Sequence, residues 1–580
     1  MTPEDVEALL QAPVPSEDGE ARSDRRTQLL REVLETLREK WSSEKQSLAP
    51  YVEKLAVGSR DDENRERVVK EGGISTIMGF IAMPDLLPYA VAVLYNLMLD
   101  YAPAQLEASN LKLSSRLVDL ISGPDPSAFQ PHLDLVCRIL KLLISQEPEP
   151  ANANPDTPLT LLNLSLDPTV AQDPEDLLSL VSASQDYLSH APLQAPFIAS
   201  GGIPAFLTIF EKLHGDAYDP EAFEDPDTSN QVKILRKVLI NAIADLTDNP
   251  SFASTHPVGS PIFSSLRAWL DSPITSLQAA ACLSLGNLSR SDEASLAFVA
   301  EHDMHTPLIA ALAGTTDTLL LHSALSFLKN LAIPPHNKAI LGPPLLAPSV
   351  LPRIWGLETL PQVQLASASL TRLLLVGNPS NAQILTSPIP PSTSESHLNG
   401  LVSLFERTDD PAKMEAARAI LATLRTLAST PDPEALEAHS PYSFEENKAG
   451  IASAVTHLLT QTRFPPVRSE ALFVLGLLAT RSPASVPAVL HLVSSADVLG
   501  VFRAAIAGSL PEAEEEPNPL AVSEPRDPKG KEGGVRADRE NCLVIVARLV
   551  KYLEAESDGG QKGELEDLLR EGGVALGKED

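Results

Sequence analysis

Two histidines and an aspartate occur together in the sequence, at His302, Asp303 and His305, and imidazole and carboxylate groups are ligands for zinc. The cluster lies where a turn between two helical segments is expected, and turn and helix-start roles account for these residue types. The cysteines are isolated and form no C-x-x-C pair, so neither a thiolate zinc site nor a disulfide framework is supported. They are Cys137, Cys282 and Cys542. We therefore expect no metal site and a reducing compartment.

Sequences that partly resemble catalytic motifs lack the residues essential for catalysis. Gly530-Lys531 and Gly577-Lys578 are each followed by Glu, whereas a phosphate-binding loop needs a Ser or Thr to hold magnesium. The sequence contains no H-E-x-x-H zinc motif and no G-x-S-x-G nucleophile motif. We expect a binding protein without catalytic side chains and without a cofactor.

The charge of the chain restricts its partners. The 580 residues include 45 Lys and Arg against 77 Asp and Glu, a net charge of −32, which repels nucleic acids and anionic membranes and favours a basic partner. The N-terminus is acidic, unlike a signal peptide, and no apolar run approaches the roughly 18 residues of a membrane span. These features predict a soluble protein of the cytosol or nucleus.

An internal repeat organises the chain. The segments Thr275-SLQAAACLSLGNLSR, Thr318-LLLHSALSFLKNLAI and Leu360-PQVQLASASLTRLLL align without gaps when Asn287, Asn330 and Arg372 are superposed. Relative to the superposed residue, each segment has Ala at −6 and Leu at −2 and +1. These positions recur at helical spacing and form one apolar stripe, and the superposed residue lies beside it. We call the superposed residue the ladder position.

The ladder position recurs about every 42 residues in the strongest repeats and defines ten slots. The slots are Lys54, Asn96, Lys141, Tyr187, Asp245, Asn287, Asn330, Arg372, Thr426 and Leu477. Turn signals such as Gly72-Gly73 and Gly201-Gly202 separate helical runs between slots. This plan predicts an all-α fold: a single elongated armadillo-repeat solenoid, right-handed, with about ten or more repeats and a concave groove.

Composition sets the expected boundaries. We expect an acidic, disordered N-terminus over 1–23 and the solenoid over 24–505, with acidic insertions near 145–176 and 214–230. Residues 506–540 are rich in Pro, Glu and Gly and predict a disordered loop, and 541–580 predict a C-terminal helical segment.

The ladder residues are the candidate partner-binding residues. Asp245, Asn287, Asn330 and Arg372 would present donors and acceptors in a row along the groove, suited to an extended main chain or a polar loop. The alternative is that such an asparagine only satisfies a neighbouring backbone group, which is the usual role of a buried polar residue.

One part of the sequence resembles a known family. The string Leu328-KNLAIPPHNKAIL, together with Ile262-FSSLRAWLDSPITSLQAAACLSLGNLSRSD, resembles the small-GTPase GDP dissociation stimulator (smg-GDS) family, over roughly 235–380. The resemblance implies an armadillo chaperone and guanine nucleotide exchange factor for Ras-superfamily GTPases, chiefly Rho type, that end in a polybasic, prenylated tail. It implies that Asn330 matches a groove asparagine in GTPase contact, with Asn287 and Asn337 as its neighbours. On this interpretation an acidic concave groove attracts the basic tail.

Other interpretations stay open. The ladder slots at Lys54, Lys141 and Tyr187 and the acidic insertions depart from the family pattern. An importin-α-like adaptor needs Trp four residues before the ladder Asn, and this chain has Leu283 and Ser326 there. A scaffold or Hsp70-cochaperone armadillo protein without exchange activity would share the fold, the charge and the lack of a catalytic site.

Overall fold

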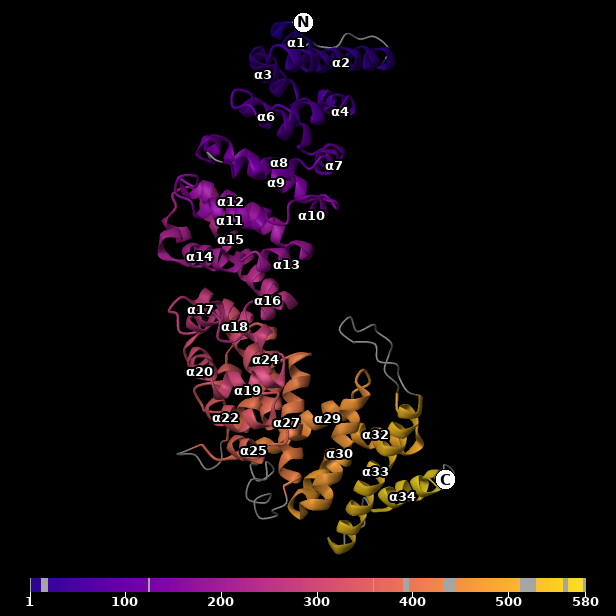
Figure 1. Ribbon diagram of the computed structural model, residues 1–580. Coiled ribbons are helices and arrows are strands. Elements are labelled where there is room, and N and C mark those ends of the chain that lie inside the picture. The colour runs from indigo at the N-terminus through magenta and orange to yellow at the C-terminus, as the bar shows by residue number, and fades with distance from the viewer. Residues whose placement is uncertain are drawn as a thin grey trace. The chain divides into compact units, whose positions relative to one another are not determined.

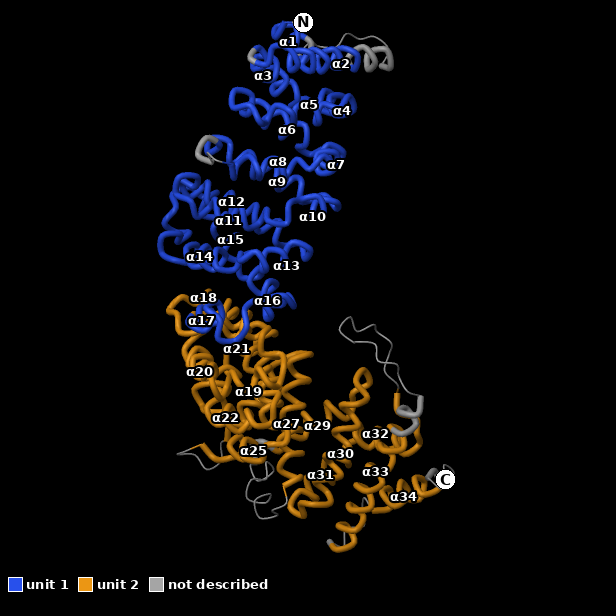
Figure 2. The backbone as a smooth tube through the Cα atoms, viewed as in Figure 1, with its two compact units in different colours: residues 1–268 blue, residues 269–580 orange. Residues whose placement is uncertain are grey.

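The computed structural model describes residues 2–11, 19–123, 126–357, 359–389, 396–430, 445–511, 528–556 and 562–576. Across these ranges the secondary structure is helical, apart from one isolated bridge between Pro388 and Ser396 (Figure 1). The chain divides into two compact units, unit 1 over Met1–Ala268 and unit 2 over Trp269–Asp580 (Figure 2). The all-α fold expected from the repeat is confirmed.

Unit 1 is built from a succession of helices, several of which begin at or next to a proline. In chain order they are α1 (Pro3–Gln11), α2 (Gly19–Ser43), η1 (Lys45–Ser47), α3 (Ala49–Gly58), α4 (Asp62–Lys70), α5 (Gly73–Met78), α6 (Leu87–Met98), α7 (Ala102–Asn110), α8 (Leu113–Ile121), η2 (Pro126–His132), α9 (Leu133–Ile144), α10 (Glu149–Asn152), α11 (Thr157–Leu166), α12 (Pro174–Leu188), α13 (Ala191–Ala199), α14 (Gly202–His214), η3 (Asp216–Tyr218), η4 (Pro220–Ala222), α15 (Pro226–Asp248), α16 (Pro250–Thr255) and α17 (Pro261–Trp269), whose last residue belongs to unit 2.

Unit 2 continues the same pattern. Its helices are α18 (Thr275–Leu288), α19 (Asp292–Ala300), α20 (His305–Gly314), α21 (Thr318–Leu331), α22 (Pro335–Leu345), α23 (Leu351–Trp355), α24 (Pro361–Leu375), α25 (Pro379–Thr386), α26 (His397–Arg407), α27 (Ala412–Ala428), α29 (Glu445–Leu459), α30 (Pro465–Arg481), η6 (Pro483–Ser485), α31 (Val486–Val493), α32 (Ala496–Ala507), α33 (Pro528–Glu556) and α34 (Lys562–Leu576).

The ladder positions fall on one helix of each repeat. We call these the ladder helices: α3, α6, α9, α12 and α15 in unit 1, and α18, α21, α24, α27 and α30 in unit 2. Within each unit, each ladder helix packs against the next. The Ala and Leu of the repeat frame, such as Ala324, Leu328 and Leu331, are buried between helices. The ten slots read from the sequence therefore correspond to ten ladder helices, one for each slot.

The N-terminus is more ordered than its composition predicts. Residues 3–11 form α1, which packs against α3 and buries Val6 and Leu10 on one side. Glu7 on α1 forms a 2.7 Å ion pair with Lys54 of α3. Two apolar residues at i, i+4 spacing are enough to attach this helix, although the segment around them is acidic.

The two acidic insertions are folded parts of their repeats. Within 145–176 the chain forms α10, α11 and the start of α12, and Glu149 is fully buried with its carboxylate accepting a 3.1 Å hydrogen bond from the Tyr187 hydroxyl. Within 214–230 the turns η3 and η4 lead into α15, and Arg236 donates to the carbonyl oxygens of Leu213 at 2.7 Å and Tyr218 at 3.0 Å. Specific hydrogen bonds therefore hold segments that composition alone marks as loops.

The C-terminal helix begins earlier than the sequence predicts. Helix α33 starts at Pro528 and not at Asn541, and residues 512–527 of the expected loop lie outside the described residues. Two charged residues hold this part of α33 in place: Asp538 accepts a 2.9 Å bond from Ser469, and Arg539 donates to the Ile506 carbonyl at 2.8 Å. Both side chains are buried, which hydrophobic patterning could not anticipate.

A buried histidine makes the stability of unit 1 depend on pH. His214 stacks on Phe210 and places Nδ1 2.9 Å from the Phe210 carbonyl oxygen, while its Nε2 is buried without a partner. Burial lowers the pKa of His214 from 6.5 to about 4, because the charged imidazolium would lose its hydration, and the positive charge of Arg236 adds to the effect.

We expect this histidine to destabilise unit 1 in acid. A lowered folded-state pKa means that the stabilising contribution is complete above pH 6.5 and is lost as the pH falls toward 4, by about 3 kcal/mol. The variant His214→Phe keeps the ring stacking and should lack this loss. The measurement is the free energy of unfolding of both proteins across that pH range, and a constant difference between them would contradict the assignment.

Candidate functional site

Several ladder residues bond backward to the previous ladder helix. The Asn330 amide donates to the Gly286 carbonyl at 3.0 Å, and the Asn96 amide donates to the Ala56 carbonyl at 2.8 Å. The Thr426 hydroxyl makes the same kind of contact with the Leu375 carbonyl at 3.0 Å. These bonds join consecutive repeats, so Asn330 has a structural role that the groove interpretation did not assign.

Asn337 is also a structural residue. It is fully buried on α22, and its Nδ2 donates to the carbonyl oxygens of Ser295 at 2.9 Å and Leu331 at 2.8 Å. Asn381 occupies the matching place on α25 and donates to Lys338 and Leu374, both at 2.9 Å. The signal was available in the sequence as two P-x-N triplets, each at the start of the helix that follows a ladder helix.

The other candidate residues lie on three different ladder helices. Asp245 is exposed on α15 in unit 1. Asn287 is half-buried on α18, and its Oδ1 accepts a 2.8 Å bond from Arg290. Arg372 on α24 forms a 2.8 Å ion pair with Glu415 of the next ladder helix. The five predicted residues therefore lie on five different helices, and their role in partner binding stays a prediction.

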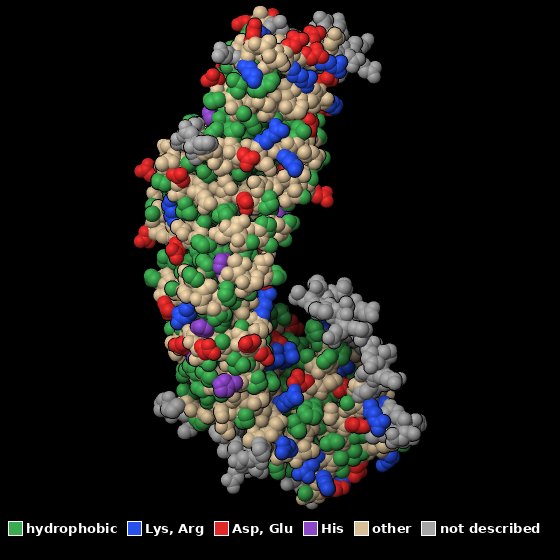
Figure 3. Space-filling model, in the orientation of Figure 1, with side chains coloured by type: hydrophobic (Ala, Val, Ile, Leu, Met, Phe, Trp, Pro, Cys, Tyr) green, Lys and Arg blue, Asp and Glu red, His purple; other side chains and the backbone are tan. Residues whose placement is uncertain are grey.

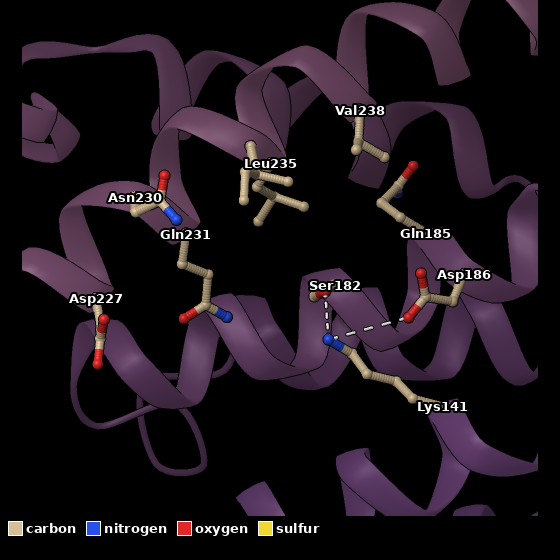
Figure 4. Close-up of a pocket in the computed structure, with 10 residues that line it drawn as sticks. Lys141, Ser182, Gln185, Asp186, Asp227, Asn230, Gln231, Leu235 and Val238 are labelled. Carbon is tan, nitrogen blue, oxygen red and sulfur yellow. Dashed lines mark hydrogen bonds and ion pairs between the residues drawn. The ribbon is translucent and has the colours of Figure 1, made fainter.

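A pocket of about 350 Å³ lies on three ladder helices of unit 1, α9, α12 and α15 (Figure 4). Lys141 extends from α9 and donates a 2.6 Å hydrogen bond to the Ser182 hydroxyl, and its Nζ lies 3.9 Å from Asp186 Oδ2. Asp227 and Gln231 of α15 lie across the hollow from Asp186. Lys141 is a ladder slot that departs from the family pattern, and it lines this pocket together with Asp186 and Asp227.

Gln185 is the most unusual residue of this pocket. The residue is only 3% exposed, yet neither its side-chain nitrogen nor its oxygen has a hydrogen-bond partner. Burying an amide without partners costs about 1 to 3 kcal/mol, so such a group is rare in a folded protein. A lining residue with both a donor and an acceptor unused is suited to bind one peptide unit of another chain, since a peptide offers one N–H and one C=O.

The charge in the pocket favours a cation. Burial raises the pKa of Asp186, an effect that Lys141 and His190 only partly offset. The Asp227 carboxylate is exposed and has no cationic partner in the part of the chain that the structure describes. A basic side chain entering the pocket would relieve the cost of ionising Asp186 and pair with Asp227.

Beyond Asp227 and Gln231, the part of α15 that lines the pocket is apolar. Ile234 is 55% exposed and Val238 is 37% exposed, and the two are one helical turn apart. The methylene stem of a Lys or Arg packs against such a surface while its charged end reaches a carboxylate.

The sequence held a signal for Gln185 as well. It occupies position −2 of the Tyr187 slot, where the strong repeats have a buried Leu. A glutamine in an apolar stripe indicates either a buried hydrogen bond or a binding role, and Gln185 is not among the predicted binding residues.

Known folds resemble the chain over nearly its whole length. A solved structure concerned with how phosphorylation switches the interaction between cadherin and β-catenin matches 95% of this chain and 96% of its own, with a TM-score of 0.52 and 15% identity. The fold is an armadillo-repeat solenoid. A designed armadillo repeat protein in complex with a (KR)4 peptide matches 48% of this chain and 98% of its own, with a TM-score of 0.35 and 16% identity. The structure of SYS-1 matches 86% of this chain and 89% of its own, with a TM-score of 0.47 and 13% identity. No family model and no curated protein matches the sequence.

Two further features of the described residues concern metal ions and membranes. Among the described residues no group of three His, Cys, Asp or Glu side chains could hold a metal ion. Asp303 instead accepts a 2.6 Å bond from Thr306. No single described helix is both long and apolar enough to cross a membrane, although two helix pairs bent by 102° and 119° meet that criterion when joined.

The charge on the armadillo ladder helices differs from the acidic groove expected from the composition. In unit 2 the five ladder helices carry seven Lys or Arg and only two Glu. Figure 3 shows basic side chains gathered over α27 and α30. The groove expectation is therefore corrected for unit 2, because the acidic residues that set the net charge lie mostly on other elements. In unit 1, the pocket on α9, α12 and α15 has two carboxylates in its lining, Asp186 and Asp227.

Proposed function

We propose that the chain is a non-catalytic armadillo binding protein whose unit 1 pocket holds an extended basic segment of a partner, the polybasic tail of a Ras-superfamily GTPase. Gln185 carries the proposal, because a buried amide with its donor and acceptor both unused matches one peptide unit. Asp186 and Asp227 supply the charge for Lys or Arg side chains, and Ile234 and Val238 receive their stems.

The choice of a GTPase rests on the resemblance over 235–380. A protein of this kind promotes exchange without a catalytic residue: if it binds the opened GTPase more tightly than the GDP form, linkage requires that it weakens GDP binding by the same factor. The prenyl group plays no part in the pocket argument, and the compartment that fits such a partner is the cytosol or nucleus.

The direct test uses a panel of GDP-loaded GTPases, each with and without its basic tail. We expect tail-dependent complex formation and faster GDP release for at least one Rho-type member. Complexes that form equally well without the tail would contradict the pocket assignment, and binding without any GDP release would reduce the function to chaperoning.

We expect Gln185→Leu to separate binding from stability. Leucine restores the ladder frame and removes the unpaired amide, so the free energy of unfolding should rise by about 1 kcal/mol or more, while affinity for the basic tail should fall about tenfold. Thermal melting and fluorescence anisotropy with a labelled tail peptide measure the two effects.

Gln105 provides the matched control. It is also a buried glutamine, 7% exposed, but its amide donates to the Met98 carbonyl at 2.8 Å and accepts from Gln146 at 2.6 Å. Gln105→Leu should therefore destabilise the protein and leave tail binding unchanged. If both variants behave alike, Gln185 is an ordinary core residue.

A further inference from the structure

The basic surface of unit 2 has a composition that the proposed function does not use. It is formed by α24, α27, α30 and the segment that leads into α30, and it comprises Arg372, Arg418, Arg425, Arg463, Phe464 and Phe473. We call it the arginine surface. We infer that the arginine surface binds an acidic, extended segment of a partner protein.

The two glutamates of this surface are each paired with arginine. Glu415 accepts from Arg372 at 2.8 Å and from Arg418 at 2.5 Å. Glu470 pairs with Arg425 at 2.9 Å. Asp410, at the pocket beside them, lies 3.6 Å from His457. Glu415 and Glu470 are therefore already neutralised and offer little to a basic partner.

The arginines of this surface, in contrast, outnumber its glutamates. Glu415 has two arginines, and although burial alone would raise its pKa, these arginines together hold it below the usual value. The Arg418 Nε is buried without a hydrogen-bond partner. Arg463 is exposed and has no acidic partner among the described residues. A carboxylate from another chain could accept hydrogen bonds from the guanidinium N–H groups that are still unused. Guanidinium groups bind carboxylates in a planar geometry with two parallel hydrogen bonds.

Apolar side chains accompany the arginines. A pocket of about 450 Å³ is lined by Leu365, Met414 and Val467 together with Arg418 and Arg463.

Phe464 is 52% exposed at the edge of this pocket. Phe473 is 42% exposed and lies under Arg425, whose guanidinium carbon is 5.6 Å from the ring centroid. Arginine and aromatic residues are the types enriched at the energetic centres of protein interfaces. The expected segment thus alternates acidic residues with apolar ones.

The chemistry favours a protein over a nucleic acid. A net charge of −32 repels a continuous phosphate backbone, whereas a short acidic segment meets the local positive charge without bringing a long anion close to the rest of the chain. The arginine surface lies on other helices than the unit 1 pocket, and its charge is positive. Its partner segment is therefore acidic and differs from a polybasic tail.

The test is fluorescence anisotropy of the full chain with a labelled peptide of alternating Glu and Leu. We expect measurable binding that weakens with salt, and about tenfold weaker binding for Arg463→Glu. Glu415→Gln, which removes a competing carboxylate, should bind more tightly than the native protein.

Arg60→Glu is the matched control, since Arg60 is exposed in unit 1, has no ion pair among the described residues, and gives the same change in net charge. The inference is overturned if Arg60→Glu weakens the acidic peptide as much as Arg463→Glu does, if the peptide fails to bind, or if single-stranded DNA displaces it more readily than excess peptide does. Arg463→Glu should leave polybasic-tail binding unchanged, so this inference and the proposed function fail separately.

Discussion

Replacing Gly342 with alanine is expected to destabilise unit 2 by about 3 kcal/mol or more. A Cβ at this position would lie 2.1 Å from Oδ1 and 2.2 Å from Nδ2 of Asn381. Asn381 is 1% exposed and is fixed by two 2.9 Å bonds to the Lys338 and Leu374 carbonyls. Because Asn381 is buried, the methyl group must displace its amide and break those two bonds. Urea denaturation followed by circular dichroism measures the loss.

Gly286→Ala is the control for this prediction. Gly286 is also a buried helical glycine of unit 2, but a Cβ there meets Phe327 at 3.6 Å, an ordinary contact distance. Alanine in a helix is favoured over glycine by about 0.5 to 1 kcal/mol, so Gly286→Ala should be neutral or stabilising. If Gly342→Ala is no less stable than Gly286→Ala, the Asn381 amide does not hold the repeats together.

The repeat frame could be predicted from the sequence because its physical cause is local and periodic. Ala at −6 and Leu at −2 and +1 must bury themselves against neighbouring helices, and that requirement recurs in each repeat. The N-terminus and the beginning of α33, which were predicted to be disordered, do not carry this repeated apolar pattern. Helix α1 is attached by two apolar residues and the first turns of α33 by charged ones, so composition suggested disorder where specific contacts give order.

The direction of a polar side chain beside an apolar stripe is harder to predict. One residue along a helix rotates the side chain by about 100°, so a small difference in helix rotation decides whether it faces a groove or the neighbouring repeat. Asn330 and Thr426 bond to the preceding ladder helix, whereas Arg425, next to Thr426, is on the outer surface. The net charge of the chain likewise does not predict the charge of a particular surface, because it does not say which helices carry the Lys and Arg residues.

Asn337 should be far more important for stability than Asn330. Asn337→Ala removes two hydrogen bonds between fully buried groups and leaves the Ser295 and Leu331 carbonyls unpaired, which should lower the free energy of unfolding by about 3 kcal/mol. Asn330→Ala removes one bond from a half-buried side chain, and about 1 kcal/mol is expected.

Binding measurements complete the comparison, because the resemblance assigns both asparagines to partner contact. Their side-chain amides already donate to the carbonyls of neighbouring helices, so neither substitution should change affinity for a GTPase once measured below the melting temperature of the variant. A partner that binds Asn330→Ala about tenfold more weakly, with the melting temperature unchanged, would return Asn330 to the binding surface. That result would also mean that the Asn330 amide exchanges its bond to Gly286 for one to the partner, since a single N–H cannot serve both at full strength.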